Sequence, residues 1–154
     1  MKLSKKCEYA LRALTRLGSP GAPSIMSIQE LAQQERIPKK FLEQVLLALK
    51  KAGILQSSRG KTGGYSLGMA PADVSLGDII RAVDGPLMAL PCLSPVVPTK
   101  CTDCTALENC WLRGVMAEVD NGLTAVLKRV SLVDMSRRAA QSQRRSASAS
   151  MYHI

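Results

Sequence analysis

The sequence predicts a mainly α-helical fold with one small β-hairpin and a long C-terminal helix. Apolar residues recur at steps of three and four over the first 52 residues, which is the spacing of amphipathic helices. A glycine-rich turn then separates two short segments of strand character. Farther along, apolar residues follow a heptad spacing from Leu112 to Val133. The 154 residues are 46% hydrophobic but only 3% aromatic, so one aliphatic core is expected.

The first predicted helix covers residues 3–17. Its apolar residues form one face at helical spacing: Leu3, Cys7, Ala10, Leu11, Leu14 and Leu17. Glu8 lies on a different face and is free to point elsewhere. Glycines and prolines at 18–23 end the helix. Neither a secretory signal nor a membrane-spanning run is recognisable, so we expect a cytoplasmic protein that does not contact a membrane.

Two further helices follow, with a very short connection between them. Ser27 and Glu30 have the spacing of a capping box, and the helix that they begin stops near Arg36. Pro38 suits the first turn of the next helix, which runs to about residue 52. Its predicted inward residues are Phe41, Leu42, Val45, Leu46 and Leu49. A supporting helix followed by two tightly joined helices is the layout of a helix-turn-helix.

The third helix turns polar side chains outward near its N-terminus, the part of a helix-turn-helix that meets base edges. Glutamine can pair with adenine through two hydrogen bonds, and lysine can reach phosphate or guanine. Strands predicted at 54–58 and 65–67 form a hairpin directly after this helix, as the wing of a winged helix does. Arg59 and Lys61 lie among glycines at its tip, where the backbone can approach DNA closely. The outward residues of the helix are Lys39, Lys40, Glu43 and Gln44.

The charge distribution supports a nucleic-acid partner. The net charge is +9, and residues 1–61 carry a balance of +8, residues 62–136 a balance of −3 and the last 18 residues a balance of +4. The sole histidine, His153, lies near the C-terminus, so no Ser/His or Cys/His pair indicates an enzyme. An iron–sulfur carrier would have no need of a basic wing. The sequence therefore predicts a DNA-binding transcription regulator without enzymatic activity.

A thiol-rich loop follows the helix predicted at 75–84, which Ser75 and Asp78 cap. Four of the five cysteines lie in the 19 residues between positions 92 and 110, in a stretch with prolines and little periodicity. In a reducing compartment such a cluster more often binds metal than forms structural disulfides. Three kinds of site remain open: an iron–sulfur cluster, a structural zinc with four thiolate ligands, and a thiol–disulfide switch. The cysteines are Cys92, Cys101, Cys104 and Cys110.

The last predicted helix carries the heptad seam over residues 112–135. A strict two-position seam indicates a partner helix, and a DNA reader gains most from two-fold symmetry, so a homodimer is expected. Gly122 interrupts the seam and allows close approach of a neighbour. Residues 136–154 are of low complexity and basic, which predicts a disordered tail. The seam residues are Leu112, Met116, Val119, Leu123, Val126, Val130 and Val133.

Four motifs give the chain a resemblance to a known family. They are MKLSKKCEYALRAL, FLEQVLLALKKAGIL, SSRGKTGGYSLG and the AVDG that ends the helix after the wing. Over residues 1–135 the chain resembles the Rrf-two (Rrf2) superfamily of winged-helix regulators, which includes IscR-like and NsrR-like proteins. The resemblance implies a homodimer on a palindromic operator of double-stranded DNA. It also implies DNA contacts by Lys40, Gln44, Arg59 and Gly60.

The resemblance further implies an iron–sulfur cluster, 2Fe–2S or 4Fe–4S, bound by Cys92, Cys104 and Cys110. Such a cluster would sense nitric oxide, redox state or iron supply and thereby control a repressor. Two features depart from the IscR pattern, because Cys101 is an additional thiol and Arg113 stands where IscR-like proteins have a histidine ligand. In NsrR-like proteins an acid in the first helix completes the site, and Glu8 is its counterpart. The fourth ligand is therefore expected to be Cys101 or Glu8.

The predicted organisation has four parts. Residues 1–85 form the DNA-binding domain, residues 86–111 the cluster-binding loop, residues 112–135 the dimerisation helix and residues 136–154 the basic tail.

Overall fold

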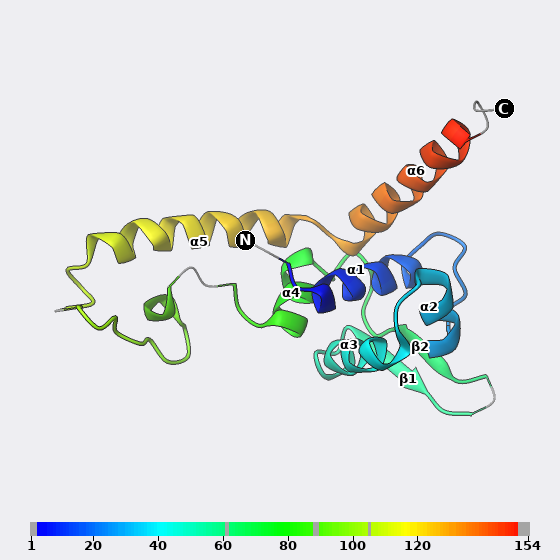
Figure 1. Cartoon of the computed structure of the whole chain (residues 1–154), viewed down its shortest axis with the longest axis horizontal. Helices are drawn as coiled ribbons and strands as arrows, with labels where there is room; N and C mark the ends of the chain where they lie inside the picture. Colours follow the sequence, from blue (N-terminus) through cyan, green and yellow to red (C-terminus); the bar gives the residue numbers. More distant parts are fainter. Residues whose placement is uncertain (1–2, 61, 88–89, 105, 151–154) are drawn as a thin grey trace.

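The structure, a computed structural model, describes residues 3–60, 62–87, 90–104 and 106–150, with side chains up to residue 145. Within these residues, six α-helices, one 3-10 helix (η1) and a two-stranded sheet follow one another along the chain (Figure 1). The elements are α1 (Lys5–Leu17), α2 (Ile28–Glu35), α3 (Lys39–Lys51), β1 (Leu55–Ser58), β2 (Gly64–Leu67), α4 (Leu76–Asp84), η1 (Pro91–Leu93), α5 (Trp111–Arg129) and α6 (Leu132–Ser150).

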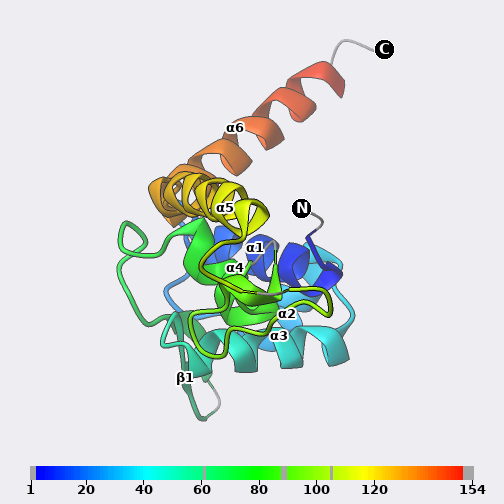
Figure 2. The ribbon, with the colours of Figure 1, turned by 90° about the vertical axis from the view of Figure 1, so that its left-hand side faces the viewer.

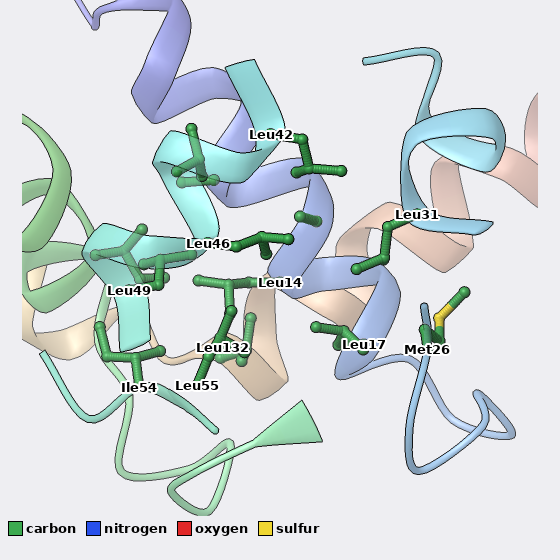
Figure 3. Close-up of a cluster of buried hydrophobic side chains, with 14 of the residues drawn as sticks. Leu14, Leu17, Met26, Leu31, Leu42, Leu46, Leu49, Ile54, Leu55 and Leu132 are labelled. Carbon is green, nitrogen blue, oxygen red and sulfur yellow. The ribbon is translucent and has the colours of Figure 1, made fainter. Parts of the chain in front are cut away.

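Helix α1 lies at the centre of the domain and packs against α2, α3, α4 and α6. Its apolar face meets leucines from α2 and α3 in a core that is aliphatic, as predicted (Figure 3). Helix α3 and the hairpin lie on one side of α1, while α6 leaves the domain on the other side (Figure 1, Figure 2). The fully buried leucines include Leu14, Leu31, Leu42, Leu46 and Leu49. The mainly α-helical fold with one hairpin is confirmed.

Local sequence signals fix the helix ends closely. Both predicted capping boxes are present, at Ser27 with Glu30 and at Ser75 with Asp78. The first helix differs from the prediction, because Ser4 caps it by accepting a hydrogen bond from the Cys7 N–H, so Leu3 stays outside it. Leu3 is 41% exposed and does not contribute to the buried face that the helical spacing assigned to it.

The long C-terminal helix is broken where the heptad pattern predicted continuity. Helix α5 ends at Arg129, and Val130 adopts an extended conformation. The Val130 carbonyl accepts a hydrogen bond from the Leu76 N–H at 2.8 Å, and the Leu132 N–H donates to the Val74 carbonyl at 2.8 Å. Ser131 then caps a new helix through hydrogen bonds with Asp134. The prediction of one helix through Val133 is wrong, because this bridge to the start of α4 holds the chain extended.

The predicted disordered tail is also corrected, because residues 136–150 belong to α6. Alanine, arginine and glutamine favour helix, and the cap at Ser131 supplies the nucleus that an isolated segment would lack. Ser136 is 2% exposed and lies against Gly18, the C-cap residue of α1, so the first turns of α6 belong to the packed domain. Residues 151–154, which include His153, lie outside the described residues.

Over the described ranges, no helix combines the length and the apolar character needed to cross a lipid bilayer.

Candidate DNA-binding surface and cysteine loop

Helices α2 and α3 meet through a connection of three residues. Arg36 ends α2 in the left-handed conformation, with a φ of 50°, and its backbone N–H donates to the Gln33 carbonyl. Ile37 is buried and Pro38 precedes the first turn of α3. The inner face of α3 is fixed in the core by Leu42, Val45, Leu46 and Leu49. This leaves the opposite face of α3 directed to solvent, as a recognition helix requires.

All the predicted polar residues of α3 are exposed. Lys40 and Gln44 are one helical turn apart on the outer face, and Lys39 and Glu43 form a parallel row beside them. Leu47, 52% exposed, continues this face toward the C-terminus of the helix. The surface therefore offers two cations and an amide at the N-terminal end of α3, where side chains of a helix-turn-helix meet base edges.

Phe41 is a correction to the predicted core. It is 51% exposed and lies against Tyr9 of α1, with ring centroids 6.5 Å apart in an edge-to-face arrangement. Leu42 lies at the centre of the apolar face and is fully buried, whereas Phe41 lies about 100° around the helix at the edge of that face, where helical spacing alone does not decide burial. This aromatic pair, of an exposed Phe41 and a half-buried Tyr9, borders the N-terminal end of α3.

The wing is held to the domain by its second strand. Strands β1 and β2 pair from Leu55 with Leu67 to Ser58 with Gly64. Tyr65 in β2 exchanges two backbone hydrogen bonds with Met26, at 3.0 and 2.8 Å. Both Arg59 and Gly60 are exposed at the tip.

Glycine is required at the tip. Gly60 has a φ of +115°, and a Cβ on Gly63 would come within 2.6 Å of the Ser58 carbonyl oxygen. Lys61, the third residue predicted to contact DNA from the wing, lies outside the described residues. The wing tip is thus a tight turn that carries an exposed arginine.

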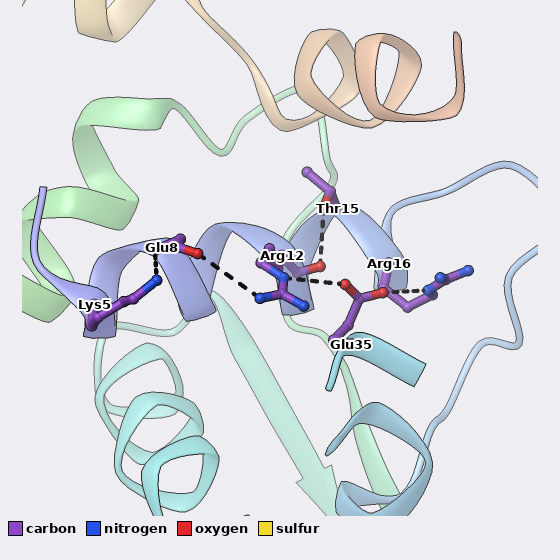
Figure 4. Close-up of polar contacts among 6 residues, drawn as sticks. All are labelled: Lys5, Glu8, Arg12, Thr15, Arg16 and Glu35. Atoms are coloured by element: carbon purple, nitrogen blue, oxygen red, sulfur yellow. Dashed lines mark hydrogen bonds and ion pairs between the residues drawn. The ribbon is translucent and has the colours of Figure 1, made fainter. Parts of the chain in front are cut away.

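An ion-pair cluster that the sequence did not reveal ties α1 to α2 (Figure 4). The Glu35 carboxylate accepts from Arg16 Nε at 2.7 Å and lies 3.6 Å from Arg12 Nε. Only 14% of the Glu35 side chain is exposed. Because Glu35 is the last residue of α2, these pairs orient the helix that precedes the turn into α3.

Substitution of Glu35 by glutamine is expected to destabilise the domain by about 1 kcal/mol, because two partly exposed arginines lose their charged partner. The loss appears as a lower urea midpoint with an unchanged slope. Glu118, an exposed acid of α5, provides the control, and Glu118→Gln should leave the midpoint unchanged. Equal midpoints for Glu35→Gln and the wild type would contradict the role given to this cluster.

Helix α5 carries two apolar stripes rather than one seam. Leu127 is buried and Leu123 half-buried, and both pack beside Ile80 of α4. The second stripe, at steps of three and four, is open: Leu112, Val115, Val119, Gly122 and Val126. The exposed fractions of its four side chains are between 42% and 53%. We name these five residues the α5 stripe. The predicted seam combined both sets and missed Val115.

The described parts of the cysteine loop, residues 86–87, 90–104 and 106–110, lie beneath the outer half of α5 (Figure 1). Cys92 lies in η1 and is 3% exposed, and its carbonyl oxygen accepts a hydrogen bond from Arg113 Nε at 3.4 Å. Cys110 is the N-cap residue of α5. Cys101 is exposed and Cys104 half-buried, and the Cys104 N–H donates to the Cys101 carbonyl at 3.1 Å, which closes a turn.

Within the described ranges, no three cysteine, histidine or acidic side chains come together in a group that could hold a metal ion. The donor chemistry nevertheless suits an iron–sulfur cluster or zinc, because four free thiols lie in one loop. Cys104 and Cys110 are half-buried, and Cys92 is buried.

Glu8 and Cys7 lie on α1, outside this loop in sequence. The Glu8 carboxylate accepts from Lys5 Nζ at 2.6 Å and lies 3.9 Å from Arg12 Nη1. The Lys5 hydrogen bond lowers the pKa of Glu8, so the carboxylate stays ionised. Cys7 is fully buried, and burial together with the nearby Asp84 charge raises its thiol pKa to about 11. Cys7 is therefore a core residue.

The five thiols should differ sharply in reactivity. Because the thiolate is the nucleophile, the raised pKa and the burial of Cys7 should leave it unlabelled by iodoacetamide at pH 8 in the folded, metal-free protein. Cys101 is exposed and should react first. Peptide mass spectrometry measures both, and full labelling in denaturant is the control. Labelling of Cys7 at the rate of Cys101 would contradict the buried position.

A recognition helix with an exposed polar face, a supporting helix and a basic hairpin together define a winged helix-turn-helix DNA-binding protein. Comparison with known proteins agrees. The Rrf2 family model, described as "Iron-dependent Transcriptional regulator", matches residues 3–138. The chain belongs to the Rrf2 family of transcription regulators, and its role is regulatory rather than enzymatic.

Individual relatives support this assignment. An HTH-type transcriptional regulator of Rhodobacter capsulatus named rrf2-like is 41% identical over 136 residues, which is 86% of this chain and 91% of the relative. The solved structure of CymR, the global cysteine regulator of B. subtilis, has a TM-score of 0.68 and 27% identity, and the match covers 90% of this chain and 98% of CymR. That of T. potens IscR has a TM-score of 0.64 and 27% identity, with 93% and 91% covered.

Proposed function

We propose that this Rrf2-family regulator acts in the cytoplasm as a homodimeric repressor of a palindromic operator. The recognition helix would read bases in the major groove, and the wing would contact the flanking backbone or minor groove. The α5 stripe would pair with its copy in the partner subunit, since four exposed apolar side chains in a row are costly to leave in water. The proposed DNA contacts are Lys39, Lys40, Gln44, Arg59, Gly60 and Lys61.

We further propose that the cysteine loop holds an iron–sulfur cluster through Cys92, Cys104 and Cys110, with Cys101 or Glu8 as the fourth ligand. When bound, the cluster would supply reactivity toward nitric oxide or oxygen and sensitivity to iron supply. The observation that carries the proposal is the direct connection between this loop and α5. Cys110 begins the helix, and Arg113 in its first turn donates to the Cys92 carbonyl oxygen.

This connection provides a route from the loop to the DNA. A change in how the thiols are held alters the position of Cys110 and of the first turn of α5. Because the α5 stripe begins at Leu112, the same change alters the contact between the two subunits. The separation of the two recognition helices follows from that contact, and a palindromic site tolerates only one separation. Loss of the bound cluster from the loop would therefore lower the affinity of the protein for its operator.

A structural zinc or a thiol–disulfide switch is the second candidate. Cys101 and Cys104 are separated by two residues and joined by a turn with a 3.1 Å hydrogen bond. Two thiols at this spacing are a common half of a tetrahedral zinc site, and a turn can also bring them together as a disulfide.

A gel shift with DNA from the promoter of the protein's own gene tests the proposal. Anaerobically purified protein should bind at low salt, and chelator-treated protein should bind on the order of 10-fold more weakly. Cys110→Ala should resemble the treated protein. Separate Glu8→Ala and Cys101→Ala variants should identify the fourth ligand, because only one should lose iron. No binding at low salt by any form would contradict a DNA regulator.

A further inference from the structure

We propose that the outer face of α6 is a second, sequence-independent DNA contact, separate from the surface formed by α3 and the wing. This face carries four arginines, which we name the α6 basic face: Arg137, Arg138, Arg144 and Arg145.

The four guanidinium groups lie on one side of the helix. Arg137 and Arg144 are seven residues apart, as are Arg138 and Arg145, and seven residues make two helical turns. The arginines therefore form two pairs about 10 Å apart along the helix axis. All four are exposed. The opposite side of α6 is the side that enters the domain, through Leu132 and Ser136.

Helix α6 itself carries little negative charge. Asp134 is the only acid of α6, and its carboxylate is occupied in the helix cap, where Ser131 donates its backbone N–H at 3.2 Å and its hydroxyl at 2.7 Å. The ion pair from Arg137 Nη1 to Asp134 is long at 3.9 Å and solvent-exposed, so it neutralises little of the charge of Arg137. Helix α6 carries four arginines against one aspartate, so its own net charge is positive.

The chemistry of the helix favours nucleic acid over a lipid surface. An amphipathic helix that lies on a membrane needs large apolar residues opposite its cations. Beyond Met135, the described side chains of α6 on the other faces are alanine, serine and glutamine. Arginine pairs bidentately with phosphate, and duplex DNA carries one charge per about 1.7 Å of axis. The helix therefore matches a phosphate backbone and lacks a membrane anchor.

The position of α6 shows that this contact must be made with another DNA segment. Both views place α3 and the wing on one side of the domain and α6 on the opposite side (Figure 1, Figure 2). A straight duplex in contact with α3 cannot also lie along α6. We conclude that a protein bound to its operator presents the α6 basic face to a second duplex, or to a distant segment of the same molecule, and bridges the two.

The test measures capture of a second duplex. Wild-type protein is bound to an immobilised fragment of its own promoter, and a labelled duplex of unrelated sequence is then added. A variant with Arg137→Gln, Arg138→Gln, Arg144→Gln and Arg145→Gln keeps good helix formers and removes the charge. At equal occupancy of the first DNA, it should capture at least about 10-fold less of the second duplex. The plot of log affinity for unrelated duplex against log salt concentration should be shallower by up to about 3.6, at about 0.9 per arginine.

A charge-matched control excludes a general effect of net charge. It replaces four exposed cations outside α6 by glutamine: Arg81, Lys100, Lys128 and Arg129. This control should capture the second duplex as the wild type does. Equal capture by the α6 variant and the wild type, or equal loss in the control, would overturn the proposal. Phosphatidylglycerol vesicles form a further arm, and binding to them in preference to the duplex would also overturn it.

A Lys40→Ala/Gln44→Ala variant separates the second contact from the proposed recognition surface. It should lose specific binding to the promoter fragment, but its remaining affinity for unrelated duplex should still fall when the four α6 arginines are replaced. If that affinity does not fall, while the wild type binds the promoter normally, only the second contact is refuted.

Discussion

Replacing Val119 with aspartate is expected to convert the proposed homodimer to a monomer and to abolish tight operator binding. Val119 is 53% exposed in the middle of the α5 stripe, next to Gly122, whose side has open space for a neighbouring helix. A carboxylate there would have to be buried without a partner in the dimer, which costs several kcal/mol. A monomer contacts one half-site, so promoter affinity should fall by about 100-fold or more. Sedimentation and gel shifts measure the two effects.

The matched control is Asn121→Asp, which adds the same charge on the same helix at an exposed position outside the stripe. It should remain dimeric and bind the promoter normally. A Val119→Asp protein that stays dimeric and binds DNA with unchanged affinity would show that the subunits associate through another surface.

The double substitution Lys40→Ala/Gln44→Ala should reduce promoter affinity by about 10- to 100-fold per half-site. Gln44 is placed for a bidentate contact with adenine, and one such contact is worth roughly 1–3 kcal/mol. Lys40 should contribute mainly through charge, so its loss should lower the salt slope by about 1 per subunit. Both side chains are exposed, so the folded structure should be unchanged. Fluorescence anisotropy over a range of salt concentrations separates the two contributions.

Lys128 and Gln143 supply the same residue types at exposed positions away from α3. The control Lys128→Ala/Gln143→Ala should bind the promoter as the wild type does. If instead Lys40→Ala/Gln44→Ala binds normally, the outer face of α3 does not read the operator, and the recognition surface must be sought elsewhere on the domain.

The parts of the fold that local sequence signals specify were predictable. The capping boxes at Ser27 and Ser75 each involve residues three apart, and the structure has both. The helix-turn-helix and the hairpin followed from apolar spacing and from the glycines between 60 and 64. The family resemblance is confirmed over nearly the same residues. Local sequence signals were sufficient to predict these segments, because their tertiary contacts favour the same helices and strands.

The break between α5 and α6 was not predicted, because contacts distant in sequence determine it. The heptad continued through Val130, whereas the hydrogen bond from the Leu76 N–H to the Val130 carbonyl holds that residue extended. A signal was nevertheless present, since Ser131 and Asp134 have the same spacing as the Ser75 box. The same segment explains why the tail is helical. Helix α6 begins from the fixed cap at Ser131, whereas an isolated segment would lack such a start.

The candidate site was predictable in its residue types but not in its arrangement. The exposure of Lys39, Lys40 and Gln44 followed from helix periodicity. The orientation of α2 by Glu35 depends on Arg12 and Arg16 of another helix, and sequence spacing gives no information on such pairs. The division of the apolar face of α5 into a stripe against α4 and a second, exposed stripe likewise depends on tertiary packing.

The iron–sulfur cluster proposed for the cysteine loop is tested most directly by the visible absorption spectrum of protein purified without oxygen, with iron, sulfide and zinc determined per chain. We expect a coloured protein that contains iron and acid-labile sulfide and loses colour on exposure to nitric oxide. A colourless protein with one zinc per chain would contradict it and would establish the loop as a structural metal site.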